Sequence, residues 1–103
     1  MLAYGFMYVD PPEVNIMINY YIVVESRSHA FLLEQRFKAE GIACEMAYMP
    51  RPIMKELCNL GIKFGEAEFP RAMAVLRKAG LPGCRLYREI VEPASFFYEE
   101  VIF

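Results

Sequence analysis

The three cysteines of this 103-residue chain have different sequence surroundings, and one of them is a candidate nucleophile. Cys44 and Cys84 fall in runs that alternate like strands, where a free cysteine is typical of the core. Cys58 instead follows a basic, proline-broken segment that contains Arg51 and Lys55. Cations and helix N-termini favour the thiolate, which is the nucleophilic form of cysteine. Cys58 is therefore the candidate working thiol, and a buried loop cysteine is the alternative.

The residues around Cys58 suggest how its charge could be stabilised. Lys55 lies three residues before Cys58, so the two share a side if residues 52–57 form a helical turn. Arg51 adds a second cation nearby, whereas Glu56 opposes both. We expect Arg51 and Lys55 to support a thiolate at Cys58.

Three further polar residues precede this segment and could assist it. Ser28 and His29 open a predicted helix, and His29 is the single histidine. A surface or packing role is typical of such a histidine; binding an anion or moving a proton near the thiol is the alternative. Glu34 lies on the apolar stripe of the same helix, where a buried carboxylate would need Arg51 or Lys63 as its partner. A glutamate at the edge of the stripe that reaches water is the alternative.

Other kinds of site lack the residues that they require. One histidine and one loop cysteine, without Cys-x-x-Cys spacing, fall short of a zinc site. Asp10 is the one aspartate and lies in the N-terminal segment, so a Ser-His-Asp triad is unsupported. Residues 80–83, Gly-Leu-Pro-Gly, are typical of a helix end and turn rather than of a phosphate-binding loop. We expect no metal and no cofactor.

Composition sets the class of protein and its location. With 56% hydrophobic and 23% charged residues, the chain is expected to form one globular domain. The net charge of −2 gives no overall attraction to nucleic acid or to an anionic membrane. No run approaches the roughly 18 apolar residues of a membrane-spanning helix. An odd number of cysteines without a secretory signal predicts reduced thiols in the cytoplasm.

Hydrophobic periodicity predicts the elements that position Cys58. Strands are expected over residues 18–25, 42–48, 60–64 and 84–90, and helices over 26–40 and 67–79. Gly41 is placed to end the first helix. This β-α-β-β-α-β order predicts a ferredoxin-like α+β domain, with a four-stranded antiparallel sheet in the order 4-1-3-2 and both helices on one face.

This topology gathers three loops at one end of the domain. They are the loop after the first strand, the segment between the second and third strands, and the loop after the second helix. The first helix also starts at this end, so its free amides face the same space. We therefore expect His29, Cys58 and residues 80–83 to lie at the same end.

The flanking segments lie outside this repeat of elements. Residues 1–17 are predicted to be an N-terminal extension to the domain at 18–90. Residues 91–103 contain the apolar run Phe96-Phe97-Tyr98, which is too apolar for a solvated tail. We expect this tail to pack on the sheet or on a second subunit, and a homodimer could form through the apolar termini.

A set of residues spread over about 18–90 resembles a known family. They are Ser28-His29-Ala30, Glu34, Phe37, Gly41, Pro50-Arg51, Cys58 and Ile62-Lys63-Phe64. The chain resembles the DUF3343 family, described as selenium/sulfur carrier protein-like, which also occurs fused to a sulfurtransferase-like module. By this resemblance Cys58 would be the carrier cysteine and Arg51 its basic neighbour. Asn59 stands where the family usually has glycine, and Glu56-Leu57 replace small serines.

Two functions are compatible with these patterns. In the first, Cys58 accepts sulfur or selenium from a donor protein, as a persulfide or selenosulfide, and passes it to an acceptor protein. Such a protein is a carrier rather than a turnover enzyme. In the second, the chain is a non-catalytic ferredoxin-like module for protein interaction or assembly, which the apolar termini favour.

Overall fold

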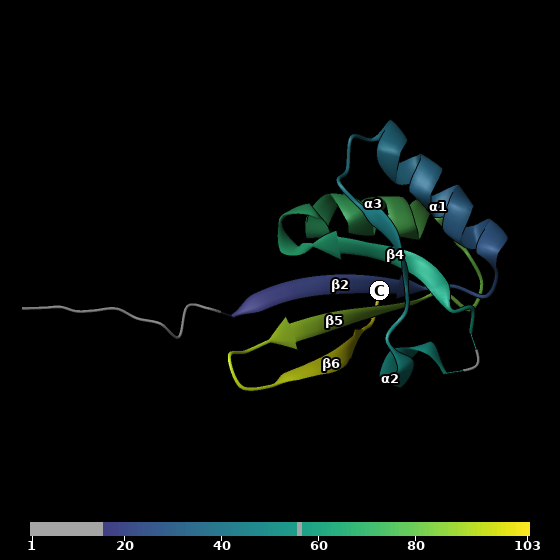
Figure 1. Cartoon of the computed structure of the whole chain (residues 1–103). Helices are drawn as coiled ribbons and strands as arrows, with labels where there is room; N and C mark the ends of the chain where they lie inside the picture. Colours follow the sequence, from purple (N-terminus) through teal and green to yellow (C-terminus); the bar gives the residue numbers. More distant parts are fainter. Residues whose placement is uncertain (1–15, 56) are drawn as a thin grey trace, which may run out of the picture.

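Five antiparallel strands form one sheet, in the order β3-β4-β2-β5-β6 (Figure 1). The computed structural model describes residues 16–55 and 57–103. Its strands are β2 (Met17–Val23), β3 (Glu45–Tyr48), β4 (Leu60–Gly65), β5 (Arg85–Val91) and β6 (Phe96–Val101). Its helices are α1 (Arg27–Ala39), α2 (Arg51–Met54) and α3 (Phe69–Ala79), with a 3-10 turn, η2 (Glu66–Glu68), before α3.

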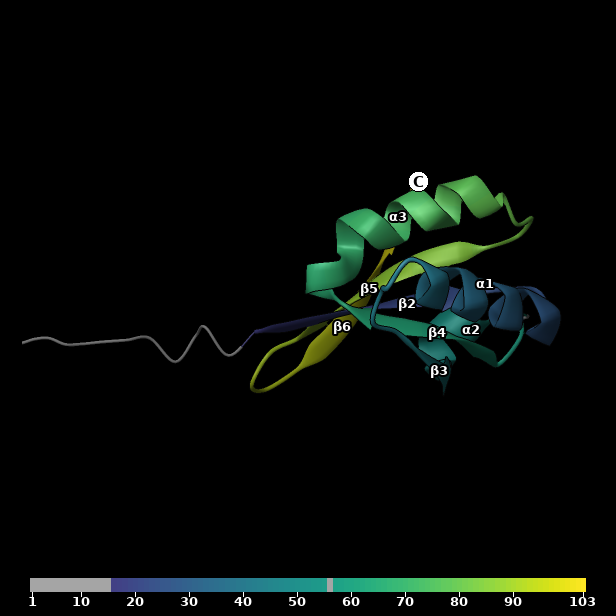
Figure 2. The same ribbon diagram turned by 90° about the horizontal axis from the view of Figure 1, so that it is seen from above.

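The predicted strand order is confirmed, but the predicted number of elements is wrong. The order β5-β2-β4-β3 is the expected 4-1-3-2 arrangement, and α1 and α3 pack beside each other on one face (Figure 2). A fifth strand, β6, extends the sheet beside β5, and a third helix, α2, packs on the opposite face. Both additions cover backbone or apolar surface that four strands and two helices would leave open.

The central strand β2 is buried on both faces, as its apolar sequence predicts. Tyr20 and Ile22 pack beneath α1 and α3, whereas Tyr21 and Val23 pack on the α2 side. The core on the helix side also takes residues from both long helices: Ala30, Leu33 and Phe37 from α1, and Ala72, Met73 and Leu76 from α3.

Both ends of α1 follow from local sequence. The Ser26 hydroxyl accepts a hydrogen bond from the His29 N–H at 3.3 Å and caps the first turn. At the other end, Gly41 adopts φ = +70°, and the Ile42 N–H donates to the Phe37 carbonyl at 2.9 Å. This is a Schellman ending, for which glycine is favoured because it has no Cβ to strain.

The strands next to two of the cysteines start later than predicted. Cys44 immediately precedes β3 and Cys84 immediately precedes β5, and both side chains are half-buried against the helix-side core. At the end of β3, Tyr48 is 73% exposed, because β3 is an edge strand.

The two flanking segments have different outcomes. Of the predicted extension at 1–17, residues 1–15 lie outside the described residues, and Met17 begins β2. Residues 91–103 complete β5 and supply β6. Packing of this segment on a second subunit stays a prediction.

Candidate functional site

Three loops meet at one end of the sheet, as the topology predicted. Val23 pairs with Arg85, so the end of β2 lies beside the start of β5. Gly83, in the loop before β5, lies against the side chain of Glu25. On the other side of β2, the Cys58 N–H donates to the Val24 carbonyl at 2.9 Å. The loops after β2, before β4 and before β5 therefore share this end, where α1 also begins.

Cys58 is held in place by this backbone hydrogen bond. It lies in the segment between α2 and β4, and Val24, its partner, is fully buried. The Cys58 side chain is half-buried and packs against the core beneath α1 and α3. The structure therefore attaches this thiol to the central strand rather than leaving it at a loop tip.

The predicted helical turn between Lys55 and Cys58 is wrong. α2 ends at Met54, and Lys55 adopts φ = +51°, outside the helical region. Lys55 and Cys58 therefore do not share a helical face. The Leu57 N–H donates to the Met54 carbonyl at 2.9 Å, which turns the chain toward β4.

Arg51 is associated with the opposite face of the sheet from Cys58. It begins α2, whose Ile53 is 2% exposed and packs with Tyr21 and Val23 on the α2 side. Arg51 and Lys55 are both exposed, and within residues 16–55 and 57–103 neither forms an ion pair. The cations therefore lie in the same chain segment as the thiol.

Ser28 and His29 lie in the first turn of α1, at the same end as Cys58. Ser28 is exposed, whereas His29 is half-buried. The Nδ1 atom of His29 is buried and has no hydrogen-bond partner among the described residues. The capping hydroxyl belongs to Ser26.

Glu34 does not pair with either cation proposed for it. Its carboxylate lies 3.5 Å from the Lys38 ammonium, one turn further along α1. Lys63 instead lies over the Tyr21 ring, 5.7 Å from its centroid, on the other face of the sheet. This position fits the alternative, a glutamate at the edge of the stripe, and a supporting role for Glu34 at the Cys58 segment stays a prediction.

Comparison with known protein families identifies the family of this chain. The family described as "Putative Se/S carrier protein-like" matches residues 19–88. The chain belongs to this family. The match runs from β2 into β5 and includes Cys58 and the three loops around it. No curated protein matches the chain, and no solved structure does.

The other two cysteines of this carrier-family domain have thiols that resist ionisation. Burial raises the pKa of the Cys84 thiol to about 11. Burial, followed by the nearby Glu34 carboxylate, raises the pKa of the Cys44 thiol. Both thiols are therefore protonated at neutral pH, which supports the sequence-based view that neither is the nucleophile.

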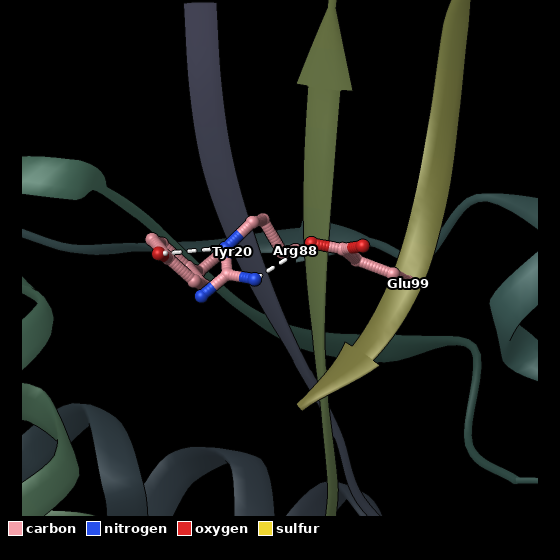
Figure 3. Close-up of polar contacts among 3 residues, drawn as sticks. All are labelled: Tyr20, Arg88 and Glu99. Carbon is pink, nitrogen blue, oxygen red and sulfur yellow. Dashed lines mark hydrogen bonds and ion pairs between the residues drawn. The ribbon is translucent and has the colours of Figure 1, made fainter. Parts of the chain in front are cut away.

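The family match ends at residue 88, and polar contacts join the strand beyond it to the matched region. Arg88 donates through Nε to the Tyr20 hydroxyl at 3.0 Å and lies 2.6 Å from the Glu99 carboxylate (Figure 3). The hydroxyl and carboxylate hold the Arg88 guanidinium protonated and raise its pKa. This chain of contacts connects β2, β5 and β6.

A second polar cluster on the opposite face was not predicted. Glu89 is 9% exposed, and its carboxylate accepts hydrogen bonds from the Tyr98 hydroxyl at 2.9 Å and from the Asn19 amide at 3.0 Å. Burial and the Glu89 carboxylate raise the pKa of Tyr98. The aromatic run Phe96-Phe97-Tyr98, of residue types that favour strands, was the available signal for β6.

Residues 16–55 and 57–103 contain neither a cluster of metal ligands nor a membrane-spanning helix. No three side chains of histidine, cysteine, aspartate or glutamate there are grouped to hold a metal ion. No helix there is long and apolar enough to cross a membrane.

Proposed function

We propose that this protein carries sulfur or selenium on Cys58, as a persulfide or selenosulfide. The observation that supports this most is the place of Cys58: half-buried, with its backbone fixed to Val24, where three loops of the family-matched domain meet. In this proposal the protein works in the reducing cytoplasm, where thiols stay free.

The transfer needs no oxidant or reductant. The Cys58 thiolate attacks the outer sulfur of a donor persulfide, forming a new S–S bond to Cys58. The S–S bond of the donor breaks, and its electron pair leaves with the donor thiolate. An acceptor thiolate then attacks the outer sulfur on Cys58 and releases the Cys58 thiolate. A terminal selenium atom follows the same two steps.

The positive groups of this end would stabilise the anionic forms. Arg51 and Lys55 are exposed in the segment that leads to Cys58, and α1 begins beside it with Ser28 and His29 in its first turn. In the proposal these groups lower the free energy of the thiolate and of the persulfide anion. Donor and acceptor proteins supply and remove the cargo, and the protein turns over no substrate of its own.

Loading of single-cysteine variants tests the carrier function. Cys58→Ser, Cys44→Ser and Cys84→Ser are incubated with glutathione persulfide, and the intact mass of each protein is measured. We expect Cys58→Ser to lose loading, because it lacks the attacking thiolate, whereas the two matched serine variants load like wild type. Retention of loading in Cys58→Ser would refute the assignment.

One observation favours the second function, a non-catalytic assembly module. β6 is an edge strand, and its Phe96 and Phe97 are 61% and 46% exposed. An exposed apolar edge can pair with another chain. The same loading experiment separates the two functions, because an assembly module leaves wild type unloaded.

A further inference from the structure

Two large aromatic side chains are exposed at the end of the domain that holds Cys58. Phe31, in the second turn of α1, is 51% exposed, and Tyr48, the last residue of β3, is 73% exposed. Neither residue contributes to the core, and the proposed chemistry at Cys58 requires neither. They belong to two elements that pack against each other, since α1 lies over β4 and β3.

Phe31 lies on the side of α1 that faces β3. Spacings of three and four residues place Arg27, Phe31 and Glu34 on one side of the helix. Glu34 is close enough to Cys44, immediately before β3, for its charge to affect that thiol. This side of α1 is therefore directed toward the β3 edge of the sheet.

Tyr48 and Cys58 lie on the same face of the sheet as α1. Met46 packs against the core beneath the helices, and Tyr48, two residues later in β3, points to the same face. Tyr48 pairs with Leu60, two residues after Cys58, and Cys58 packs against that same core. Phe31, Tyr48 and the candidate thiol therefore border one surface.

The charges of the molecule are divided between its two ends. The exposed cations at the Cys58 end include Arg27, Arg51, Lys55 and Arg85, against Glu25 and Glu100 as exposed carboxylates there. At the opposite end of the sheet, beside the cations Lys38 and Arg71, the loops and element ends carry several carboxylates: Glu40, Glu45, Glu66, Glu68 and Glu92. A chain with a net charge of −2 thus presents a cationic end.

We propose that the surface formed by Arg27, Phe31 and Tyr48 docks an acidic protein partner, which exchanges cargo with Cys58. This inference rests on the proposed carrier function for the exchange. Tyrosine and arginine are enriched among the residues that dominate binding energy, and cations select an acidic partner and speed its approach. Two exposed aromatics on separate elements can be covered together by a protein surface, whereas a small donor needs the thiol alone.

Disulfide trapping tests this docking surface. Cys58 is activated as a mixed disulfide with thionitrobenzoate and exposed to an extract of the source cells, and captured proteins are counted by non-reducing gels and mass spectrometry. The test variants are Phe31→Ala/Tyr48→Ala and Arg27→Glu. The matched controls are Phe97→Ala, an exposed phenylalanine on β6, and Arg36→Glu, an exposed arginine further along α1.

We expect each test variant to capture at least one acidic protein about tenfold less than wild type, the loss expected when a dominant contact is removed. The controls should stay within about twofold of wild type, and added salt should weaken capture. Equal capture by test and control variants would overturn the inference. So would the absence of any captured protein when thionitrobenzoate release shows that Cys58 was activated.

Failure of the docking surface and failure of the carrier function give different results. Phe31→Ala/Tyr48→Ala should still load from glutathione persulfide, because this small donor needs the thiol alone. If wild type does not load, the carrier function fails. If wild type loads but the variants capture proteins normally, the docking surface alone fails.

Discussion

Burial, more than neighbouring charge, raises the pKa of the Cys44 and Cys84 thiols. Cys84 packs against the core before β5, and burial raises the pKa of its thiol to about 11. Cys44 is also shifted upward, by burial and then by Glu34. Cys58 was singled out in the sequence by its cations, but Lys55 leaves the helical path at φ = +51° and does not lie beside it as predicted. The three-residue spacing between Lys55 and Cys58 could not reveal this, because the prediction assumed one helical turn over residues 52–57.

Alkylation of Cys84 should show its shifted pKa directly. In the folded protein we expect its reaction with iodoacetamide to rise with an apparent pKa of about 11, because burial disfavours the thiolate. In the unfolded chain the same thiol should titrate near 8.5. Peptide mass spectrometry measures both profiles. An ordinary profile in the folded protein would contradict the burial of Cys84.

The same shift has a consequence for stability. Because the pKa of Cys84 is higher in the folded protein, its contribution to stability is fully present below about pH 8.5 and is lost as the pH rises through about 11. The free energy of unfolding should therefore fall over that range, and less steeply in Cys84→Ala. Using this difference between variants cancels the contribution of the tyrosines.

At the scale of elements, β4 depends on a glycine that allows close packing next to the site. A Cβ at Gly61 would overlap the Ile22 carbonyl oxygen and lie 2.8 Å from the Met49 sulfur. Met49 is buried and leads from β3 into α2. Gly61 thus lets the segment that carries Arg51 lie against the sheet.

Substitution of Gly61 should be costly, and Gly65 in the same strand provides the control. We expect Gly61→Ala to lower the free energy of unfolding by about 1–3 kcal/mol, because the neighbouring backbone must move. Gly65→Ala should change it by less than about 0.5 kcal/mol, since no atom lies within 4 Å of the added Cβ. Urea denaturation measures both variants. Equal losses would show that Gly61 has no special packing role.

Elements with clear end signals could be predicted from the sequence, and short ones could not. Ser26 and Gly41 mark the two ends of α1, and the structure places the helix between them. The expected turn over residues 52–57 became a helix over Arg51–Met54, because φ at Lys55 breaks it. In β6, apolar and charged side chains occur on both faces of the strand, so the sequence shows no period-two alternation.

At the scale of the whole molecule, the order of the predicted strands could be inferred from the sequence more reliably than the number of strands in the sheet. The order of β5, β2, β4 and β3 follows from the sequence order of helices and strands and from right-handed crossovers. The fifth strand lies outside that repeat and pairs with β5 as a hairpin, through the short loop at residues 92–95. The ion pair between Arg88 and Glu99 joins the two strands.

The end of the molecule that carries Cys58 was also predicted from topology. Three loops and the start of α1 meet there, and Cys58 is joined to Val24. The division of charge between the two ends was not visible in a net charge of −2. It depends on which loops the fold brings together.

The measurement that tests the central proposal most directly is the location of the cargo on wild-type protein. The protein is loaded from glutathione persulfide, and the persulfide is then trapped with an alkylating agent. After digestion, the mass of each cysteine peptide is measured by mass spectrometry. We predict the added sulfur on the Cys58 peptide alone, with release by a thiol acceptor that restores the free cysteine. Added sulfur on the Cys44 or Cys84 peptide, or on none of the three, would contradict the proposal.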